Sequence, residues 1–440
     1  MEREPLRPVA DTLLSLLVEK PAAGGRMIAR HNGQVVLVAG AIPGERVRAR
    51  VERTKGGVIY ASTVDVETPS ADRRTASGDP SCGGNVYAHV AYARQTVLKG
   101  EIVADALRRI GHITLEAPVH VHASPEMGYR MRARLHVRGG RIGFFREGTH
   151  ELCDAGASGQ LLPDTMEFLN ALGASLQDAR VSVVRELELA ENVSADQRAV
   201  LLELEPGSAA PHAVLRSLSL PHAHGVLVSQ PTAPDRLASR GNPHVTDVLS
   251  LSADGVDAAL TLRRHVASFF QGNRYLLASL VQRVVTQVPH GPVIDLYAGV
   301  GLFGLACAAV RRGEVVAVEG DRYSAQDLQH NAHPFQGTVR VVTASVEAFL
   351  AREQISTDAT VIVDPPRTGM SSQASQGIAA ARPGRIIYVS CDVATLARDV
   401  GRLVAGGYQL DSIEAFDLFP NTAHVETLAV LAGGARPART

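Results

Sequence analysis

The chain of 440 residues contains no tryptophan, four cysteines and three lysines. The cysteines, Cys82, Cys153, Cys307 and Cys391, are widely separated, which predicts no paired disulfide framework and is typical of a reducing compartment. No apolar run approaches the ~20 residues that a membrane-spanning helix needs, and no apolar signal core follows the first residues. We therefore expect a cytoplasmic protein without a membrane partner.

Hydrophobic residues make up 45% of the chain, and its length allows two or three domains with packed cores. The net charge of −1 argues against a generally polybasic protein. Positive charge is nevertheless concentrated in residues 26–55, with seven basic and two acidic side chains, and in residues 127–148, with six arginines and one glutamate. Both stretches predict phosphate contacts, and two solvated faces are the alternative.

The most informative stretch is residues 385–399. The run of β-branched and aromatic residues at 386–389 predicts a buried strand, and a helical pattern begins at 394, so Cys391 falls where the strand gives way to the helix. Helix N-termini favour negative charge, so we expect this position to lower the pKa of the thiol. The alternative is a small buried hydrophobic residue.

Two further stretches of the sequence help to interpret Cys391. Residues 361–369 read Val-Ile-Val-Asp-Pro-Pro-Arg-Thr-Gly, and residues 416–426 read Phe-Asp-Leu-Phe-Pro-Asn-Thr-Ala-His-Val-Glu. Together with the cysteine stretch they resemble, in order and spacing, the signatures of the RNA (uracil-5-)-methyltransferase family, which uses S-adenosylmethionine. The resemblance implies that Cys391 is the nucleophile and Glu426 the base.

Three positions depart from the family pattern: Asp392 replaces an Asn, Val393 a Pro and Asn421 a Gln. None is the implied nucleophile or base, so the departures bear on local geometry and substrate choice. Arg367 stands where methyltransferases of amino groups usually have an aromatic residue, which favours carbon as the methyl acceptor. We include Arg367 among the expected RNA-binding residues.

The implied chemistry suits a thiol and a carboxylate. Carbon 5 of uracil is a weak nucleophile, and addition of the Cys391 thiolate to carbon 6 would place negative charge on carbon 5. Glu426 would then remove the carbon 5 proton, and its neighbour Val425 is expected to help raise its pKa. His424 would position the loop, and the uridine would be extruded into the pocket. Cytosine-5 methylation and a non-catalytic RNA-binding protein remain alternatives.

Residues 10–68 predict a small antiparallel barrel, because Asn32-Gly33 and Pro43-Gly44 are turn dipeptides between short β-rich runs. Alternation along the fourth run places Arg48 and Arg50 on one face, which suits single-stranded or irregular RNA. The stretch resembles a TRAM domain, an RNA-binding module of OB type.

Residues 69–262 predict a strand-rich central RNA-binding domain, with one helix over 92–111 that we expect to pack on the catalytic domain. Arg130 and Arg132 share one side of a strand by the two-residue period, and this strand resembles one whose arginines face RNA in the family. Pairing of these arginines with the acidic stretch 186–205 is the alternative. Residues 207–257 look loop-like.

Many relatives bind an iron–sulfur cluster through four cysteines, two of them in a Cys-Gly-Gly-Cys segment. Here that segment is Cys82-Gly-Gly-Asn85, no cysteine precedes it, and the later ligand position falls near Ser158 rather than on Cys153. A [4Fe-4S] cluster normally requires four thiolates. We therefore expect no iron–sulfur cluster and no other metal, with Cys82 as a leftover ligand.

Residues 263–440 predict an α/β domain, a Rossmann-like doubly wound sheet that binds S-adenosylmethionine. A strand, a glycine turn and a helix follow one another over 292–306, and the glycines would let the backbone approach a ligand. A carboxylate at the end of the next strand can accept ribose hydroxyls. By resemblance and position, the cofactor-binding residues are Gln271, Tyr297, Gly299, Gly301, Glu319 and Asp364. Leu302 replaces an Asn that contacts the cofactor in some relatives.

The RNA substrate is not fixed by these motifs. The TRAM-like head and the leftover cysteine segment favour the 23S ribosomal RNA branch of the family over the transfer RNA branch. We expect a monomer.

Overall fold

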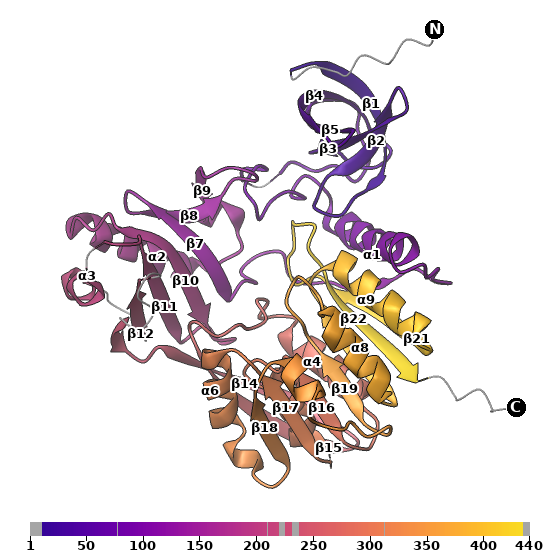
Figure 1. The fold of residues 1–440 in the computed structure, drawn as a ribbon. Helices are drawn as coiled ribbons and strands as arrows, with labels where there is room; N and C mark the ends of the chain where they lie inside the picture. Colours follow the sequence, from indigo (N-terminus) through magenta and orange to yellow (C-terminus); the bar gives the residue numbers. More distant parts are fainter. Residues whose placement is uncertain are drawn as a thin grey trace, which may run out of the picture.

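The computed structural model describes residues 11–76, 78–208, 210–219, 225–230, 237–311 and 313–433. In chain order the protein forms a barrel, a central sheet and an α/β unit, and these occupy distinct regions of the molecule (Figure 1). Residue 10 and residues 434–440, which the expected first and last domains include, lie outside the described residues.

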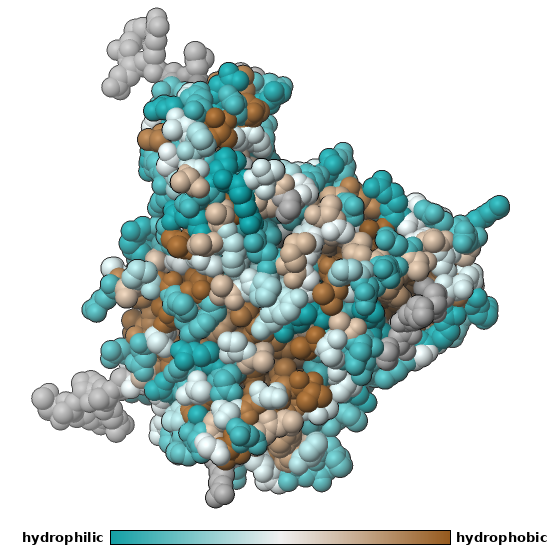
Figure 2. Space-filling view, turned by 180° about the vertical axis from the view of Figure 1, so that it is seen from behind, coloured by the Kyte–Doolittle hydropathy of each residue, from teal (hydrophilic) through white to brown (hydrophobic). Residues whose placement is uncertain are grey.

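Five strands close into the barrel, in which β1 pairs with β2 and β4, and β5 lies between β3 and β4. They are β1 (Leu13–Pro21), β2 (Met27–His31), β3 (Gln34–Ala39), β4 (Arg46–Lys55) and β5 (Val58–Thr68). Val47 and Ala49 are buried inside, whereas Arg48 and Arg50 are exposed outside, as the alternation of a strand requires. The predicted barrel is confirmed, except that β3 and β5 pair in parallel and not antiparallel. Its exterior carries both hydrophilic and apolar residues (Figure 2).

The central sheet has seven described strands in the order β13-β12-β11-β10-β7-β8-β9. They are β7 (Arg132–Arg138), β8 (Arg141–Phe145), β9 (Leu152–Asp154), β10 (Val184–Glu191), β11 (Arg198–Leu204), β12 (Gly225–Ser229) and β13 (Leu237–Gly241), covered by α2 (Pro163–Asp178) and α3 (Pro211–Ser217). The loop-like interpretation of residues 207–257 was wrong, because α3, β12 and β13 lie there. β12 is a short run that is buried along most of its length, too short to stand out among the surrounding Pro, Ser and Ala residues.

Cys82 and Cys153 form a disulfide, so the expectation of no paired cysteines was wrong. Gly83 N donates to Phe145 O at 3.2 Å, which holds the Cys82 segment against β8, and β9 brings Cys153 beside it. The hydroxyl of Ser158, near which the family's later ligand position was expected, donates to Ala155 O at 2.6 Å. Within the described ranges, no group of three or more His, Cys, Asp or Glu side chains is arranged to hold a metal ion.

The α/β unit is built on eight described strands in the order β18-β17-β16-β19-β20-β22-β21-β6. They are β16 (Val293–Leu296), β17 (Val315–Glu319), β18 (Val339–Thr343), β19 (Thr360–Val363), β20 (Arg385–Ser390), β21 (Tyr408–Phe416), β22 (Glu426–Gly433) and β6 (His120–His122). The helices are α4 (Leu277–Gln287), α5 (Leu302–Val310), α6 (Arg322–Asn331), α7 (Val346–Leu350), α8 (Ser372–Ala381) and α9 (Val393–Ala405). Strands β16 to β20 are parallel, and all but the edge strand β18 contribute buried side chains to the cores on both faces, which confirms the doubly wound sheet.

The boundary expected between residues 262 and 263 was wrong, because it cuts the hairpin β14 (His244–Ala253) and β15 (Val256–His265). Leu249 and Leu262 of this hairpin belong to the same hydrophobic core as α4 and α5. Strand β6 joins the eight-stranded sheet of the α/β unit beside β21. Helix α1 (Tyr92–Arg109) packs on α9, as we expected for that helix. Across the described part of the chain, no helix has the length and apolar character needed to cross a bilayer.

Candidate active site

A cavity of about 770 Å³ lies where the carboxyl ends of β16, β17, β19 and β20 face the start of β7. Its walls include most of the residues predicted from the sequence: Arg130, Arg132, Gln271, Tyr297, Gly299, Glu319, Asp364, Arg367, Cys391 and Glu426. Gly301 lies outside these walls, and Arg48 and Arg50 lie on the barrel. Parallel strands present their carboxyl ends at one edge, which is why residues so far apart in the chain meet here.

Cys391 and Glu426 are brought together by the pairing of β20 with β22. In this antiparallel pair Ser390 lies opposite Thr427, so Cys391 and Glu426 occupy the next pair of positions along the ladder. Both line the cavity, with Cys391 half-buried and Glu426 buried. The thiol and the carboxylate can therefore reach a ring placed between them.

The helix after Cys391 is capped by a carboxylate. Asp392 Oδ1 accepts from the backbone N–H groups of Ala394 at 3.1 Å and Thr395 at 2.8 Å, so α9 directs these donors to Asp392 and not to the thiol. Burial raises the pKa of Cys391 to about 12, and the neighbouring Glu426 adds to the rise. The expected lowering of the thiol pKa by the helix was wrong.

Arg367 opposes the rise in the pKa of the Cys391 thiol, both by its charge and by hydrogen bonding to the sulfur. Its backbone also ties the Pro-Pro turn to α9, since Thr395 Oγ1 donates to Arg367 O at 3.3 Å. The residue counted from the sequence among RNA contacts is therefore a neighbour of the reactive sulfur.

The cavity is rich in buried carboxyl groups. Burial raises the pKa of Glu426 well above its ordinary value, with Asp364 adding to the rise, so the expected direction of this shift is confirmed. Burial also raises the pKa of Asp364, which the hydrogen bond from Gln271 Nε2 to Asp364 Oδ2 at 3.2 Å opposes. Below the cavity floor, burial raises the pKa of Asp295 to about 8. Such a concentration of acids favours a positively charged ligand.

The glycine turn after β16 is shaped by Glu319 at the end of β17. Gly299 N donates to Glu319 Oε2 at 2.7 Å, and Asp321 N donates to Glu319 Oε1 at 2.6 Å. Gly299 has a φ of 57°, and a Cβ added there would meet nothing within 4 Å, so its surroundings are open to a ligand. Burial raises the pKa of Glu319.

Gly301 serves packing and not ligand approach. Its φ is 98°, and an added Cβ would lie 2.5 Å from Leu305 and 2.9 Å from Leu328, both side chains of the protein core. The expectation that Gly301 lets a ligand approach the backbone was therefore wrong. Leu302, noted as a departure from the family, begins α5 and is buried in the same core.

Arg130 and Arg132, which both line the cavity, differ in their partners. Arg132 Nη2 donates to Glu188 Oε2 at 2.7 Å, so the alternative of pairing with the acidic stretch holds for this residue. Arg130 lies before β7 and not within it. Its guanidinium lies over the rings of Phe144 and Phe419, at 5.5 Å and 5.7 Å, and among the described residues its Nε has no hydrogen-bond partner.

Sequence reasoning missed several residues of the cavity walls: Arg134, Phe269, Phe419, Asp321 and Ser324. Phe419 lies inside the stretch 416–426 that was identified from the sequence, and Phe269, two residues before Gln271, is 56% exposed. An aromatic residue on a polar loop next to a catalytic motif was the signal that could have found them, because such exposure is unusual for Phe.

Comparison with known proteins gives matches over most of the chain. The family model described as tRNA (Uracil-5-)-methyltransferase matches residues 244–433, and the TRAM domain model matches residues 13–64. An uncharacterized RNA methyltransferase of Streptomyces avermitilis is 31% identical, with 94% of this chain and 97% of the relative covered. The 23S rRNA (uracil(1939)-C(5))-methyltransferase RlmD of Pseudomonas putida is 31% identical, with 95% and 93% covered.

A solved structure shares the fold over nearly the whole chain. It is the Pyrococcus abyssi tRNA (uracil-54, C5)-methyltransferase in complex with S-adenosyl-L-homocysteine, with a TM-score of 0.70 and 24% identity, and the match covers 95% of this chain and 100% of that one.

Proposed function

This chain belongs to the RNA (uracil-5-)-methyltransferase family, and from that premise we propose that it methylates carbon 5 of a uridine in 23S ribosomal RNA, with S-adenosylmethionine as the methyl donor and Cys391 as a covalent nucleophile. The observation that carries the proposal is the placement of Cys391 and Glu426 at neighbouring positions of one antiparallel pair, inside a single cavity. Ribosomal RNA is favoured by relatives named as 23S rRNA methyltransferases that match the chain over its barrel as well as its catalytic unit.

The cavity suits S-adenosylmethionine, which carries an electrophilic methyl group on a positively charged sulfonium. Asp364 and Glu426 provide negative charge once ionised, and Glu319 at the end of β17 can accept ribose hydroxyls beside the open backbone of Gly299. Gln271 holds Asp364 in place. These residues and Tyr297 form the proposed cofactor site.

The residues of the chain then act in a fixed order. The Cys391 sulfur forms a bond to carbon 6 of uracil, and the ring electrons move to carbon 5, which takes the methyl group. Glu426 removes the proton from carbon 5, and those electrons re-form the ring double bond as the Cys391 thiolate leaves carbon 6. The Arg367 guanidinium stabilises the thiolate at the start and at the end of the cycle.

The raised pKa of the free Cys391 thiol is compatible with this order of chemical steps. In the ligand-free cavity Cys391, Asp364 and Glu426 all have raised pKa values, so the thiol is protected from adventitious reaction. A bound cation favours the ionised form of every one of these groups. The methyl donor therefore shifts these groups toward their ionised forms when it occupies the cavity.

RNA would reach the cavity past the arginines that line it. Arg130 and Arg132 line the cavity, and the exposed Arg48 and Arg50 lie on the outside of the barrel. Phosphate contacts of this kind position RNA without reading its sequence.

The test is methylation of 23S ribosomal RNA and transfer RNA transcripts by the purified protein, followed by nucleoside analysis. We expect 5-methyluridine in the ribosomal RNA, and no product with Cys391→Ala, which should still bind S-adenosylmethionine. Product from the alanine variant would contradict the nucleophile, 5-methylcytidine would indicate the cytosine alternative, and product in transfer RNA alone would contradict the ribosomal substrate.

A further inference from the structure

The turn between β21 and β22 connects two parts of the active site. It runs from Asp417 to Val425, and the residues on either side of it, Phe416 and Glu426, lie opposite each other in the hairpin. The turn also carries Phe419, whose side chain lines the cavity beside Cys391 and Glu426. The position of this turn therefore sets the position of the base and of one wall of the site.

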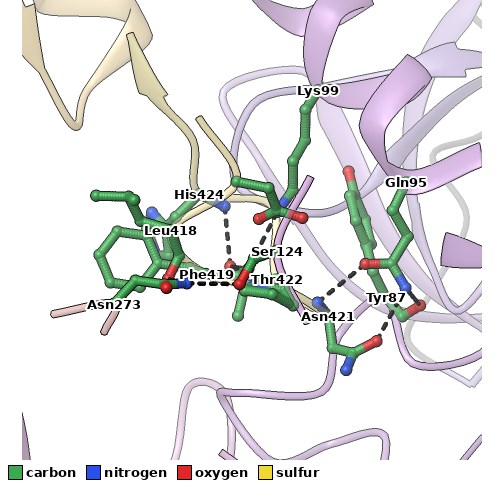
Figure 3. A network of polar contacts seen from close by, with 12 residues as sticks. Tyr87, Gln95, Lys99, Ser124, Asn273, Leu418, Phe419, Asn421, Thr422 and His424 are labelled. Carbon is green, nitrogen blue, oxygen red and sulfur yellow. Dashed lines mark hydrogen bonds and ion pairs between the residues drawn. The ribbon is translucent and has the colours of Figure 1, made fainter. Parts of the chain in front are cut away.

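Four successive carbonyl groups of the turn are held by donors from outside the hairpin, and the donor residues Tyr87, Lys99 and Asn273 are labelled in Figure 3. Leu418 O accepts from Asn273 Nδ2 at 3.1 Å, Phe419 O from Lys99 Nζ at 3.0 Å, Pro420 O from the Tyr129 hydroxyl at 3.4 Å, and Asn421 O from Tyr87 N at 2.8 Å. Three of these donors come from the chain before the catalytic unit. The turn is thus fixed from the N-terminal half of the molecule.

Among these four donors Lys99 is the charged one. Its ammonium group also pairs with Asp417 at the start of the turn, and both side chains are completely buried. Removing two charges from water costs several kcal/mol per ion, and the attraction offsets this only when the geometry is good and further hydrogen bonds are made. The second bond, to Phe419 O, supplies such a contact, so the ammonium fixes two points of the turn.

The same helix holds the turn at a second position. Gln95 lies one helical turn before Lys99 on α1, its Nε2 donates to Asn421 Oδ1, and its Oε1 accepts from Asn421 N, each at 2.9 Å. Asn421 has a φ of 63°, which suits the tight turn that these two bonds enclose. The Asn that replaces the family's Gln at 421 is accommodated by this pair.

We propose that Lys99 is a positioning residue for methyl transfer, which fixes Phe419 and Glu426 through the β21–β22 turn from a helix outside the cofactor-binding sheet. Its ammonium ends on the turn and not in the cavity, so it acts through Glu426 and not on the uridine. The inference rests on the proposed role of Glu426 as the base. It makes α1 part of the catalytic apparatus and not only a link to the barrel.

Two variants and a matched control test the proposal. Lys99→Met removes the ammonium and keeps the aliphatic chain, and the double variant Lys99→Met/Asp417→Asn also avoids an unpaired buried carboxylate. Lys20→Met is the control, since Lys20 pairs at 2.9 Å with Asp105 of the same helix, is partly exposed and lies away from the turn. Each protein is assayed for folding by circular dichroism, for S-adenosylmethionine binding by calorimetry, and for kcat, KM and covalent protein–RNA adduct.

We expect Lys99→Met, or the double variant if only that one folds, to lower kcat by about 10- to 100-fold, because a small displacement of a catalytic group has an effect of this size. The adduct should accumulate, since proton removal is the step that slows. Cofactor affinity and the KM for RNA should stay within about twofold, and Lys20→Met should match the wild type.

Three results would overturn the proposal. One is a folded Lys99 variant with unchanged kcat, and another is a parallel loss of kcat and cofactor affinity, which would indicate a general structural effect. The third is failure of both variants to fold, which would assign the ion pair to folding. A wild-type protein that forms no 5-methyluridine would instead contradict the proposed function, so the two failures are distinguishable.

Discussion

The state of the Cys391 thiol gives the sharpest chemical prediction. Its pKa is raised from an ordinary 9.0 to about 12, and three units correspond to a roughly thousandfold smaller thiolate fraction at neutral pH. A thiolate of higher pKa is intrinsically more nucleophilic, by about twentyfold for three units. We therefore expect alkylation of Cys391 by iodoacetamide to be about 50-fold slower in the native protein than in the unfolded chain.

The assay follows carbamidomethylation of the Cys391 peptide by mass spectrometry between pH 7 and pH 10. Restricted access would slow the reaction equally at every pH, whereas a raised pKa makes the rate rise tenfold per pH unit over this whole range. The same peptide in urea is the reference, and its rate should level off near pH 9. A native rate that levels off below pH 8 would refute the reasoning and would mean that the N-terminus of α9 does activate the thiol.

The methyl donor provides a second arm of this experiment. S-adenosylmethionine and S-adenosylhomocysteine have nearly the same shape, but only the first carries the sulfonium charge. Since a nearby cation favours the thiolate, alkylation of Cys391 should be faster with the first ligand than with the second. Equal rates would show that the sulfonium does not reach the thiol electrostatically.

Three further predictions follow from the site and the fold. Glu319→Gln should weaken S-adenosylmethionine binding about 10- to 100-fold in calorimetry, because hydrogen bonds to a charged group contribute ~1.5–3 kcal/mol, and a change under twofold would argue against the ribose contact. The affinity for S-adenosylmethionine should rise as the pH passes through the raised pKa of Asp364 and should then level off, because the cationic cofactor binds the carboxylate more tightly than the neutral acid. Asp364→Asn should remove most of this pH dependence. Unfolded, unreduced protein should show two titratable thiols, and reduction of Cys82–Cys153 should lower the free energy of unfolding by about 2–4 kcal/mol, whereas four thiols without reductant would contradict the disulfide.

Much of the cavity could be predicted because its residues lie at strand ends. Asp364 and Cys391 each follow a short apolar run, and Glu319 ends one, so a parallel sheet must place all three at one edge. Glu426 begins a strand, and it reaches the same edge because β22 runs antiparallel to β20.

The rest depends on contacts between distant segments, which local pattern does not encode. Cys82 and Cys153 meet only because β9 folds back beside the segment before α1, and the burial of Lys99 depends on a turn more than three hundred residues away. The thiol pKa was misjudged because burial, which raises it most, is not encoded in the local pattern, and because Asp392 caps α9 and was noted only as a departure from a motif. Because the Asp392 side chain accepts hydrogen bonds from the first backbone N–H groups of α9, those groups do not stabilise a thiolate at Cys391, the residue before the cap.

The most direct measurement of the central claim is intact-mass and peptide analysis of Glu426→Gln after incubation with S-adenosylmethionine and 23S ribosomal RNA. The account predicts a stable adduct in which Cys391 is bonded to a methylated uridine, because the base that allows its release is missing. An adduct on another residue, or normal 5-methyluridine formation without any adduct, would contradict it.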